Sequence, residues 1–194
     1  MTKGRLEAFS DGVIAVIITI MVLELKVPPG SEPAALLPLT PSFFGYALSF
    51  VFVGIYWNNH HHLLQTAESV NGRILWANLH LLFWMSLIPF VTSWMGNNNF
   101  APWPVALYGA DLLLAGFAYW LLARALIVHH GRESRVASAI GQDLKGLASL
   151  LLYTIAIPLA FLNSRWSCGI YIIVALMWLI PDPRIEKTFS RNPS

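Results

Sequence analysis

The chain has 194 residues, of which 56% are hydrophobic and only 11% charged, with a mean hydropathy of +0.59 and a formal net charge of +2. A soluble domain carries far more charge on its surface, so this composition excludes an ordinary soluble protein and indicates an integral membrane protein. The length accommodates about six spans of roughly 20 residues and leaves no room for a separate soluble domain. The single cysteine, Cys168, excludes an internal disulfide and a cysteine-only metal site.

Six apolar stretches follow one another along the chain, too long and too uniformly apolar for the strands of a barrel. We expect membrane-spanning helices over residues 7–25, 42–64, 73–95, 104–128, 145–163 and 166–181. The acidic residues Glu7 and Asp11 argue against a cleaved signal peptide, so we expect the first span to be retained. The sequence thus predicts an all-α integral membrane protein in which residues 1–194 form one six-helix transmembrane domain.

The basic residues indicate how these spans are oriented. An even number of spans puts both termini on one side of the membrane, and ten of the 12 Lys and Arg residues fall on that side. These ten are Lys3, Arg5, Arg73, Arg124, Arg132, Arg135, Lys145, Arg184, Lys187 and Arg191. Because cytoplasmic loops carry an excess of Lys and Arg, we expect both termini in the cytoplasm.

The first span combines an apolar stripe with an unexpected carboxylate. At 100° per residue, one face of this helix carries Phe9, Val13, Val16, Ile20 and Leu23, with Thr19 at its edge. Asp11 lies nearly opposite Val16, and a carboxylate at membrane depth usually faces protein or water. The stripe fits either an ordinary packing seam or the lining of a symmetric pore with apolar rings that gate by dewetting.

A second polar cluster closes the second span and continues on the third. It comprises Trp57, Asn58, Asn59, His60, His61 and His62, followed by Asn78 and His80. Three adjacent histidines point in different directions on a helix, which disfavours a zinc site. We therefore expect a hydrogen-bonded network that meets Ser10 and Asp11 and fixes the rotation of the first span, and we expect no metal.

Other chemistry is sparse. Asp111 in the fourth span is a further intramembrane acid, either functional or simply near the membrane interface. No nucleophile elbow, Walker loop, His-Glu-x-x-His pair or paired-carboxylate signature occurs. We expect neither an enzyme nor a cofactor, and no nucleic-acid partner.

The opening motif resembles that of a known family. The matching residues are Arg5-x-x-x-Phe9-Ser10-Asp11-Gly12-Val13, then Thr19, Leu23-Glu24, Trp57-x-x-His60-His61, Leu75-Trp76-Ala77-Asn78-Leu79 and Ser86-Leu87-Ile88-Pro89-Phe90. This order of motifs resembles the transmembrane protein 175 family of potassium channels in its prokaryotic form. The resemblance covers most of the first three spans, whereas the second half matches only as three further hydrophobic spans.

The resemblance implies a six-span subunit without a carbonyl filter loop, assembled as a homotetramer in a prokaryotic plasma membrane. It places the pore on the first span, with a hydrophobic constriction at Val16, Ile20 and Leu23 and with Val13 and Thr19 adjacent to it. It makes Arg5, Phe9, Ser10 and Asp11 the anchor of that helix. The narrowest ring in relatives is usually Ile or Leu, whereas the matching position here is Val16, so which ring is tightest stays open.

The implied activity is a leak-like flux of potassium ions across the lipid bilayer, because no span carries the repeated arginines of a voltage sensor. Three alternatives remain open. One is a proton leak or proton-coupled carrier that uses Asp11, His60, His61 and Asp111. The others are a metal protein or enzyme built on the histidine cluster, and a scaffold with no flux of any kind.

Overall fold

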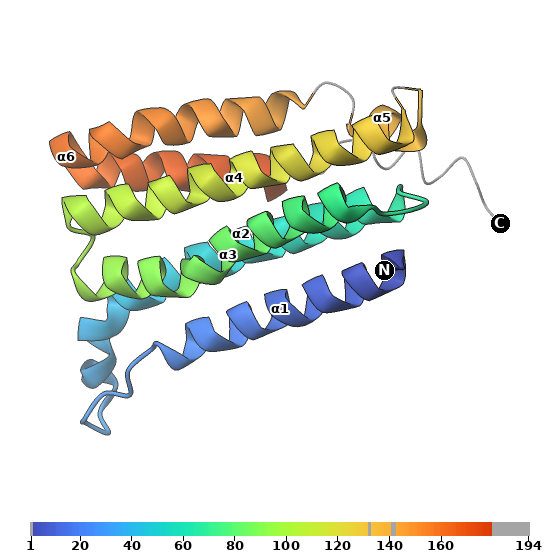
Figure 1. Ribbon diagram of the computed structural model, residues 1–194. Helices are drawn as coiled ribbons and strands as arrows, with labels where there is room; N and C mark the ends of the chain where they lie inside the picture. Colours follow the sequence, from blue (N-terminus) through green and yellow to red (C-terminus); the bar gives the residue numbers. More distant parts are fainter. Residues whose placement is uncertain (1, 132, 141–142, 180–194) are drawn as a thin grey trace.

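The computed structural model describes residues 2–131, 133–140 and 143–179, and all regular secondary structure in these ranges is helical (Figure 1). Its elements are α1 (Lys3–Leu23), the 3₁₀ helix η1 (Pro33–Leu39), α2 (Thr40–Gln65), α3 (Gly72–Asn97), α4 (Pro102–His130), α5 (Arg135–Ile140) and α6 (Leu144–Leu179). Five of these helices are long and apolar enough to cross a membrane.

α6 consists of two helical legs joined by a bend. Asn163 has an extended backbone (φ −159°, ψ 105°) that divides it into two legs. The Ser167 hydroxyl donates to the Ala156 carbonyl at 2.8 Å, and the Trp178 indole donates to Ser149 Oγ at 2.9 Å. Since these contacts join residues on opposite sides of the bend, the legs run antiparallel, the first orange and the second red in Figure 1. The five long helices therefore make six passes.

Local residues explain where the helices begin and end. The Asn71 side chain accepts a hydrogen bond from the Ile74 backbone N–H at 3.0 Å and caps the start of α3. α4 begins at Pro102, where a missing N–H costs nothing, and ends before Gly131, whose positive φ of 92° suits glycine.

The observed helices differ from the predicted spans at their ends. α1 begins at Lys3, whereas the predicted span begins at residue 7. Hydropathy detects only the apolar part of a helix, so it leaves out the charged first turn. The polar segment 129–144 contains the short helix α5, which hydropathy does not reveal. Residues 180–181 of the predicted sixth span lie outside the described part of the chain.

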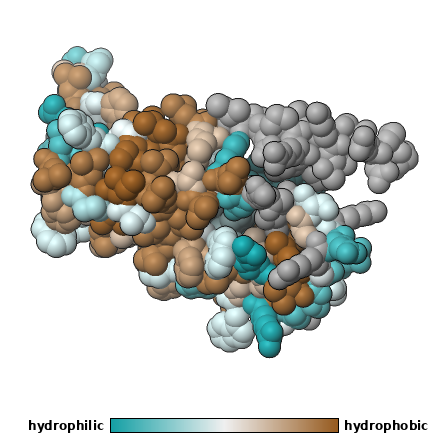
Figure 2. Space-filling view, turned by 90° about the horizontal axis from the view of Figure 1, so that it is seen from above, coloured by the Kyte–Doolittle hydropathy of each residue, from teal (hydrophilic) through white to brown (hydrophobic). Residues whose placement is uncertain are grey.

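The helices form a layered bundle with α1 at one edge. α1 packs on α2 and α3, α3 packs on α4, and α4 packs on α6 (Figure 1). One hydrophobic core joins α1 to α2, α3 and α4, and a second joins α6 to α2, α3 and α4. On the face over α4 and α6, Figure 2 shows brown apolar side chains across the middle and teal ones toward the ends, as a membrane protein requires.

Candidate functional site

The inward face of α1 is its packing seam. Its buried residues are Leu6, Ser10, Ile14, Ile17 and Met21, at spacings of four, four, three and four. This set follows one side of the helix and packs against α2 and α3. The seam is therefore a different face from the apolar stripe that the sequence analysis singled out.

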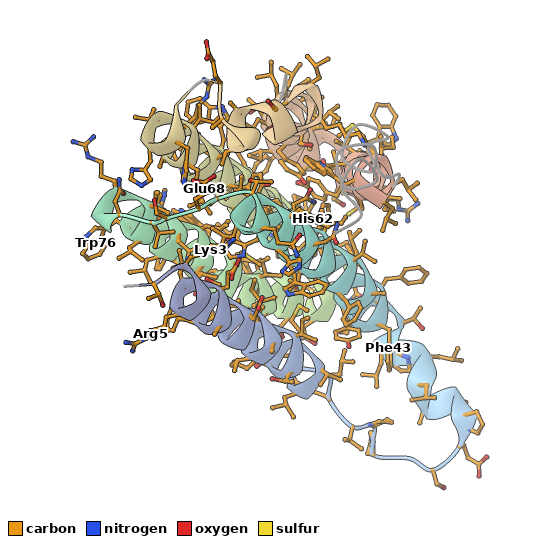
Figure 3. The ribbon with its side chains drawn as sticks, turned by 90° about the vertical axis from the view of Figure 1, so that its right-hand side faces the viewer. Lys3, Arg5, Phe43, His62, Glu68 and Trp76 are labelled. Carbon is orange, nitrogen blue, oxygen red and sulfur yellow. The ribbon has the colours of Figure 1, made fainter. Side chains whose placement is uncertain are left out.

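That stripe is turned out of the subunit. It lies roughly 100° around the helix from the seam, and the exposed fraction is 54% for Val16, 42% for Ile20 and 80% for Leu23. Phe9 is also exposed, whereas Val13 is half-buried against the core. Figure 3 shows α1 at the outer edge of the bundle with the Arg5 side chain pointing away from the other helices. The stripe is thus free to meet another subunit, lipid or a pore.

Thr19 stands on the same outward side of α1. Its hydroxyl donates to the Val16 carbonyl at 2.8 Å, so the donor is hydrogen-bonded within the helix. The hydroxyl oxygen keeps its capacity to accept and faces outward among apolar neighbours.

A directional chain of hydrogen bonds joins the buried side of α1 to the neighbouring helices. His60 Nε2 on α2 donates to Asn78 Oδ1 on α3 at 2.7 Å. The Asn78 amide nitrogen donates to Ser10 Oγ at 2.9 Å, and Ser10 Oγ donates to the Leu6 carbonyl at 2.9 Å. His60, Asn78 and Ser10 are all buried, so this chain fixes the rotation of α1 against its neighbours.

Asp11 is held by a separate contact beside this chain. The Trp57 indole N–H donates to Asp11 Oδ1 at 3.0 Å. The Trp57 ring stacks on His61 with centroids 5.9 Å apart, and the Gln65 amide donates to His61 Nε2 at 2.8 Å. The Asp11 carboxylate therefore faces α2 and not the apolar stripe.

The two ends of α1 are also tied down. At the start, Lys3 Nζ donates to the Gln65 carbonyl at 3.2 Å and lies 3.8 Å from Glu7. Just beyond the other end, the Ser93 hydroxyl on α3 donates to Glu24 Oε2 at 3.0 Å. Arg5 has no side-chain partner among the described residues.

The predicted residues do not all come together. Asp111 on α4 is only 4% exposed, and neither of its carboxylate oxygens has a hydrogen-bond partner among the described residues. No hydrogen bond in the described part of the chain links it to Asp11, His60 or His61. A relay through all four groups therefore has no continuous path within this subunit.

The histidine run divides its contacts among different neighbours, as described above for His60 and His61. Within the described ranges, no group of three or more His, Cys, Asp or Glu side chains is arranged to hold a metal ion.

Sequence reasoning missed a buried hydroxyl cluster. Ser49 Oγ lies 2.6 Å from Thr92 Oγ1 and 3.0 Å from the Tyr108 hydroxyl, joining α2, α3 and α4. The only signal in the sequence was three hydroxyl residues inside apolar spans. Their spacing along the chain gives no hint that they meet.

Comparisons with known proteins decide the family. The family model of the endosomal/lysosomal potassium channel TMEM175 matches residues 5–89, which hold α1, α2 and most of α3. A potassium channel from Chryseobacterium sp. (strain P1-3) is 55% identical over 192 residues, covering 99% of this chain and 100% of that one. The chain belongs to the TMEM175 family. This confirms the resemblance carried by the motif that begins at Arg5.

A solved TMEM175 structure shares the fold. The crystal structure of a lysosomal potassium-selective channel TMEM175 homolog from Chamaesiphon minutus matches with a TM-score of 0.80 and 28% identity, over 92% of this chain and 96% of that one. The predicted all-helical membrane fold is thereby confirmed. TMEM175 proteins are ion channels rather than enzymes.

A further relative is named for protons and not for potassium. The endosomal/lysosomal proton channel TMEM175 of Homo sapiens is 28% identical over 195 residues. The match takes up 88% of this chain but only 38% of the human protein.

Proposed function

We propose that this protein is a potassium-permeable, leak-like cation channel of a prokaryotic plasma membrane. Four copies assemble around an axis, and α1 of each copy lines the pore. Val16, Ile20 and Leu23 form a hydrophobic constriction that serves as gate and filter, with Val13 and Thr19 beside it. Both termini lie in the cytoplasm. The names of the bacterial relatives support the permeant ion, and the placement of α1 supports the pore.

The observation that carries this proposal is the contrast between the two sides of α1. Its buried side is tied by Ser10 to Asn78, while its other side presents Val16, Ile20 and Leu23 outside the subunit. Each subunit has one helix of this kind, so a closed pore requires several copies related by symmetry.

The mechanism follows from the chemistry of an apolar ring. Such a ring passes an ion only when water enters it, and the ion sheds part of its hydration there. Potassium holds its water less tightly than sodium, so a narrow apolar neck favours potassium without a dedicated binding site. The Thr19 oxygen supplies an acceptor between the Val16 and Ile20 rings, where it can replace a lost water. This arrangement predicts weaker selectivity than a cage of carbonyls gives.

The test is flux from proteoliposomes of the purified protein under a potassium gradient, repeated with sodium, with valinomycin as the positive control. Ile20→Ala widens the proposed neck and should raise potassium flux while lowering discrimination against sodium. The matched control is Ile172→Ala on α6, because Ile172 is exposed to a similar extent (48%). This control should leave both fluxes unchanged.

The outcomes separate the parts of the proposal. No cation flux from folded protein rejects the channel, and equal effects of Ile20→Ala and Ile172→Ala reject α1 as the lining. Native mass spectrometry of the same sample tests the assembly, and any stoichiometry other than four rejects the tetramer.

A proton channel is the second candidate. It is favoured by the name of the human relative and by the placement of Asp11, which accepts from Trp57 at the α1–α2 contact, where the Trp57 ring stacks on His61. Proton flux that persists without potassium, and that depends on the Asp11 charge, would support it.

A further inference from the structure

A cavity lies between α2, α4 and α6, within the part of the bundle that α1 does not reach. Its volume is about 40 Å³, whereas one water needs about 10–15 Å³ on the same measure, so it accommodates a group several times larger than water. Six of the side chains that line it are aromatic: Phe52, Tyr56, Tyr119, Trp120, Tyr153 and Trp178. Asn59 and Asp143 are among its polar lining residues.

Most of the hydrogen-bond donors around this cavity are already used within the protein. The Tyr56 hydroxyl donates to the Leu112 carbonyl at 3.3 Å, and the Tyr119 hydroxyl donates to the Asn59 carbonyl at 3.3 Å. Further donors are committed in the same way: the Asn59 amide nitrogen to Ile55, the Ser149 hydroxyl to Lys145, and the Trp178 indole to Ser149. The cavity therefore has little to offer a ligand that needs donors.

The lining groups that remain available to a ligand are electron-rich. Asp143 precedes α6, and its Oδ1 accepts from the Gly146 backbone N–H at 2.8 Å. Its Oδ2 has no hydrogen-bond or ion-pair partner among the described residues. The Asn59 side-chain oxygen and the faces of the aromatic rings complete the lining. Ring faces and a carboxylate both attract positive charge.

One ring already binds a cation on one face. The Arg124 guanidinium lies 5.2 Å from the centroid of the Trp120 ring. The contact illustrates the affinity of this ring for cations, although the charge of Arg124 opposes a second cation nearby.

We propose that this cavity binds a small organic ammonium ion of the tertiary or quaternary class. The alkylated head lies against the rings of Tyr56, Tyr119 and Tyr153, and Asp143 supplies the counter-charge. A metal ion of similar charge would require several oxygen ligands, whereas this wall is mainly aromatic. A plain alkyl chain would offer nothing to Asp143 Oδ2, the carboxylate oxygen that does not accept from Gly146. The site does not depend on the proposed pore, because none of its lining residues belongs to α1.

The experiment measures equilibrium binding of radiolabelled choline to the full-length purified protein in detergent. The comparison ligand is 3,3-dimethylbutan-1-ol, which has the shape of choline without its charge. We expect saturable choline binding, competition by tetramethylammonium, and binding of the neutral analogue weaker by about ten-fold or more. Equal binding of the two molecules, or no saturable choline binding, would overturn the proposal.

Variants locate the site. Asp143→Asn removes the charge and should weaken choline binding about ten-fold, and Asp143→Glu should restore most of it. Trp120→Leu should weaken binding several-fold. The matched controls are Glu32→Gln, an exposed carboxylate at the other end of the bundle, and Trp103→Leu, an exposed indole on α4.

The assignment fails if Asp143→Asn binds choline as the wild type does, or if the controls weaken it equally. Thermal unfolding of each variant separates loss of the site from loss of the fold. Since binding is measured without ion flux, a protein that conducts no potassium can still confirm this site, and a conducting protein can still refute it.

Discussion

The side-chain amide of Asn78 on α3 donates to Ser10 Oγ on α1 at 2.9 Å and, through its oxygen, accepts from His60 on α2. A single amide thus uses both ends to join three helices. The orientation of each group is fixed because the Ser10 hydroxyl donates its own hydrogen bond to the Leu6 carbonyl and can only accept from Asn78. This contact determines which side of α1 faces the bundle, and thereby which side is left for the pore.

Asn78→Ala should destabilise the protein more than an ordinary polar truncation, because it leaves His60 and Ser10 buried without their partner. A buried group left unsatisfied costs about 1–3 kcal/mol, and interhelical hydrogen bonds in membranes average about 0.6 kcal/mol. The measurement is thermal unfolding in detergent, with the exposed Asn58→Ala on α2 as the control. Equal unfolding temperatures for the two variants would show that the three-helix junction is not stabilising.

Asp11→Asn separates the two candidate functions. The asparagine oxygen can still accept from the Trp57 indole, so the α1–α2 contact at 3.0 Å survives while the charge is lost. If Asp11 only positions α1, potassium flux should stay within about two-fold of the wild type. This corresponds to a change in the free-energy barrier to conduction of less than about 1 kcal/mol. Proteoliposomes with a pH-sensitive dye inside measure proton flux in the same preparation. Loss of proton flux with potassium flux retained would assign Asp11 to a proton path.

The sequence predicted the helices well because membrane spans can be recognised by their length and hydropathy. It also predicted that the polar residues inside the spans would contact one another. Ser10 and Asn78 are hydrogen-bonded, and His60 of the histidine run is the second partner of Asn78. The bend at Asn163 falls at the break between the predicted spans 145–163 and 166–181. The helix α5 was not predicted, because hydropathy reports where a chain is apolar and this helix lies in a polar segment.

The direction of each side chain was harder to predict. Periodicity placed Val16, Ile20 and Leu23 on one face of α1, but an apolar stripe has the same spacing whether it packs or lines a pore. The structure shows that the packed face is a different one, which includes Ile14 and Ile17. Asp111 could not be placed at all, because its surroundings come from helices distant in sequence.

Gly109 on α4 permits a close approach of α6. A Cβ at this position would overlap the hydroxyl end of the Tyr171 ring, whose O–H donates to the Val105 carbonyl at 3.0 Å. Gly109→Ala should therefore lower stability by about 1–3 kcal/mol despite the better helix propensity of alanine. Thermal unfolding in detergent is compared with Gly54→Ala, where a Cβ meets nothing within 4 Å.

Adding Tyr171→Phe to Gly109→Ala removes the hydroxyl that clashes, so the double variant should recover part of the lost stability. If the two substitutions simply add, the overlap at Gly109 is relieved in some other way and the packing argument fails.

His130 at the end of α4 should hold the connection between α2 and α3 in place. His130 Nδ1 donates to the Leu126 carbonyl at 3.0 Å, while Nε2 accepts from the backbone N–H groups of Glu68 (3.1 Å) and Ser69 (3.3 Å). This pattern requires a neutral ring. Because only an unprotonated ring nitrogen can accept, both backbone bonds depend on the imidazole of His130.

Hydrogen exchange measured by mass spectrometry should therefore show protected Glu68 and Ser69 amides in the wild type. His130→Ala should lose that protection, whereas His61→Ala, which leaves the His130 contacts intact, should keep it. Unchanged protection in His130→Ala would mean that the loop is held by its own turns and not by the imidazole.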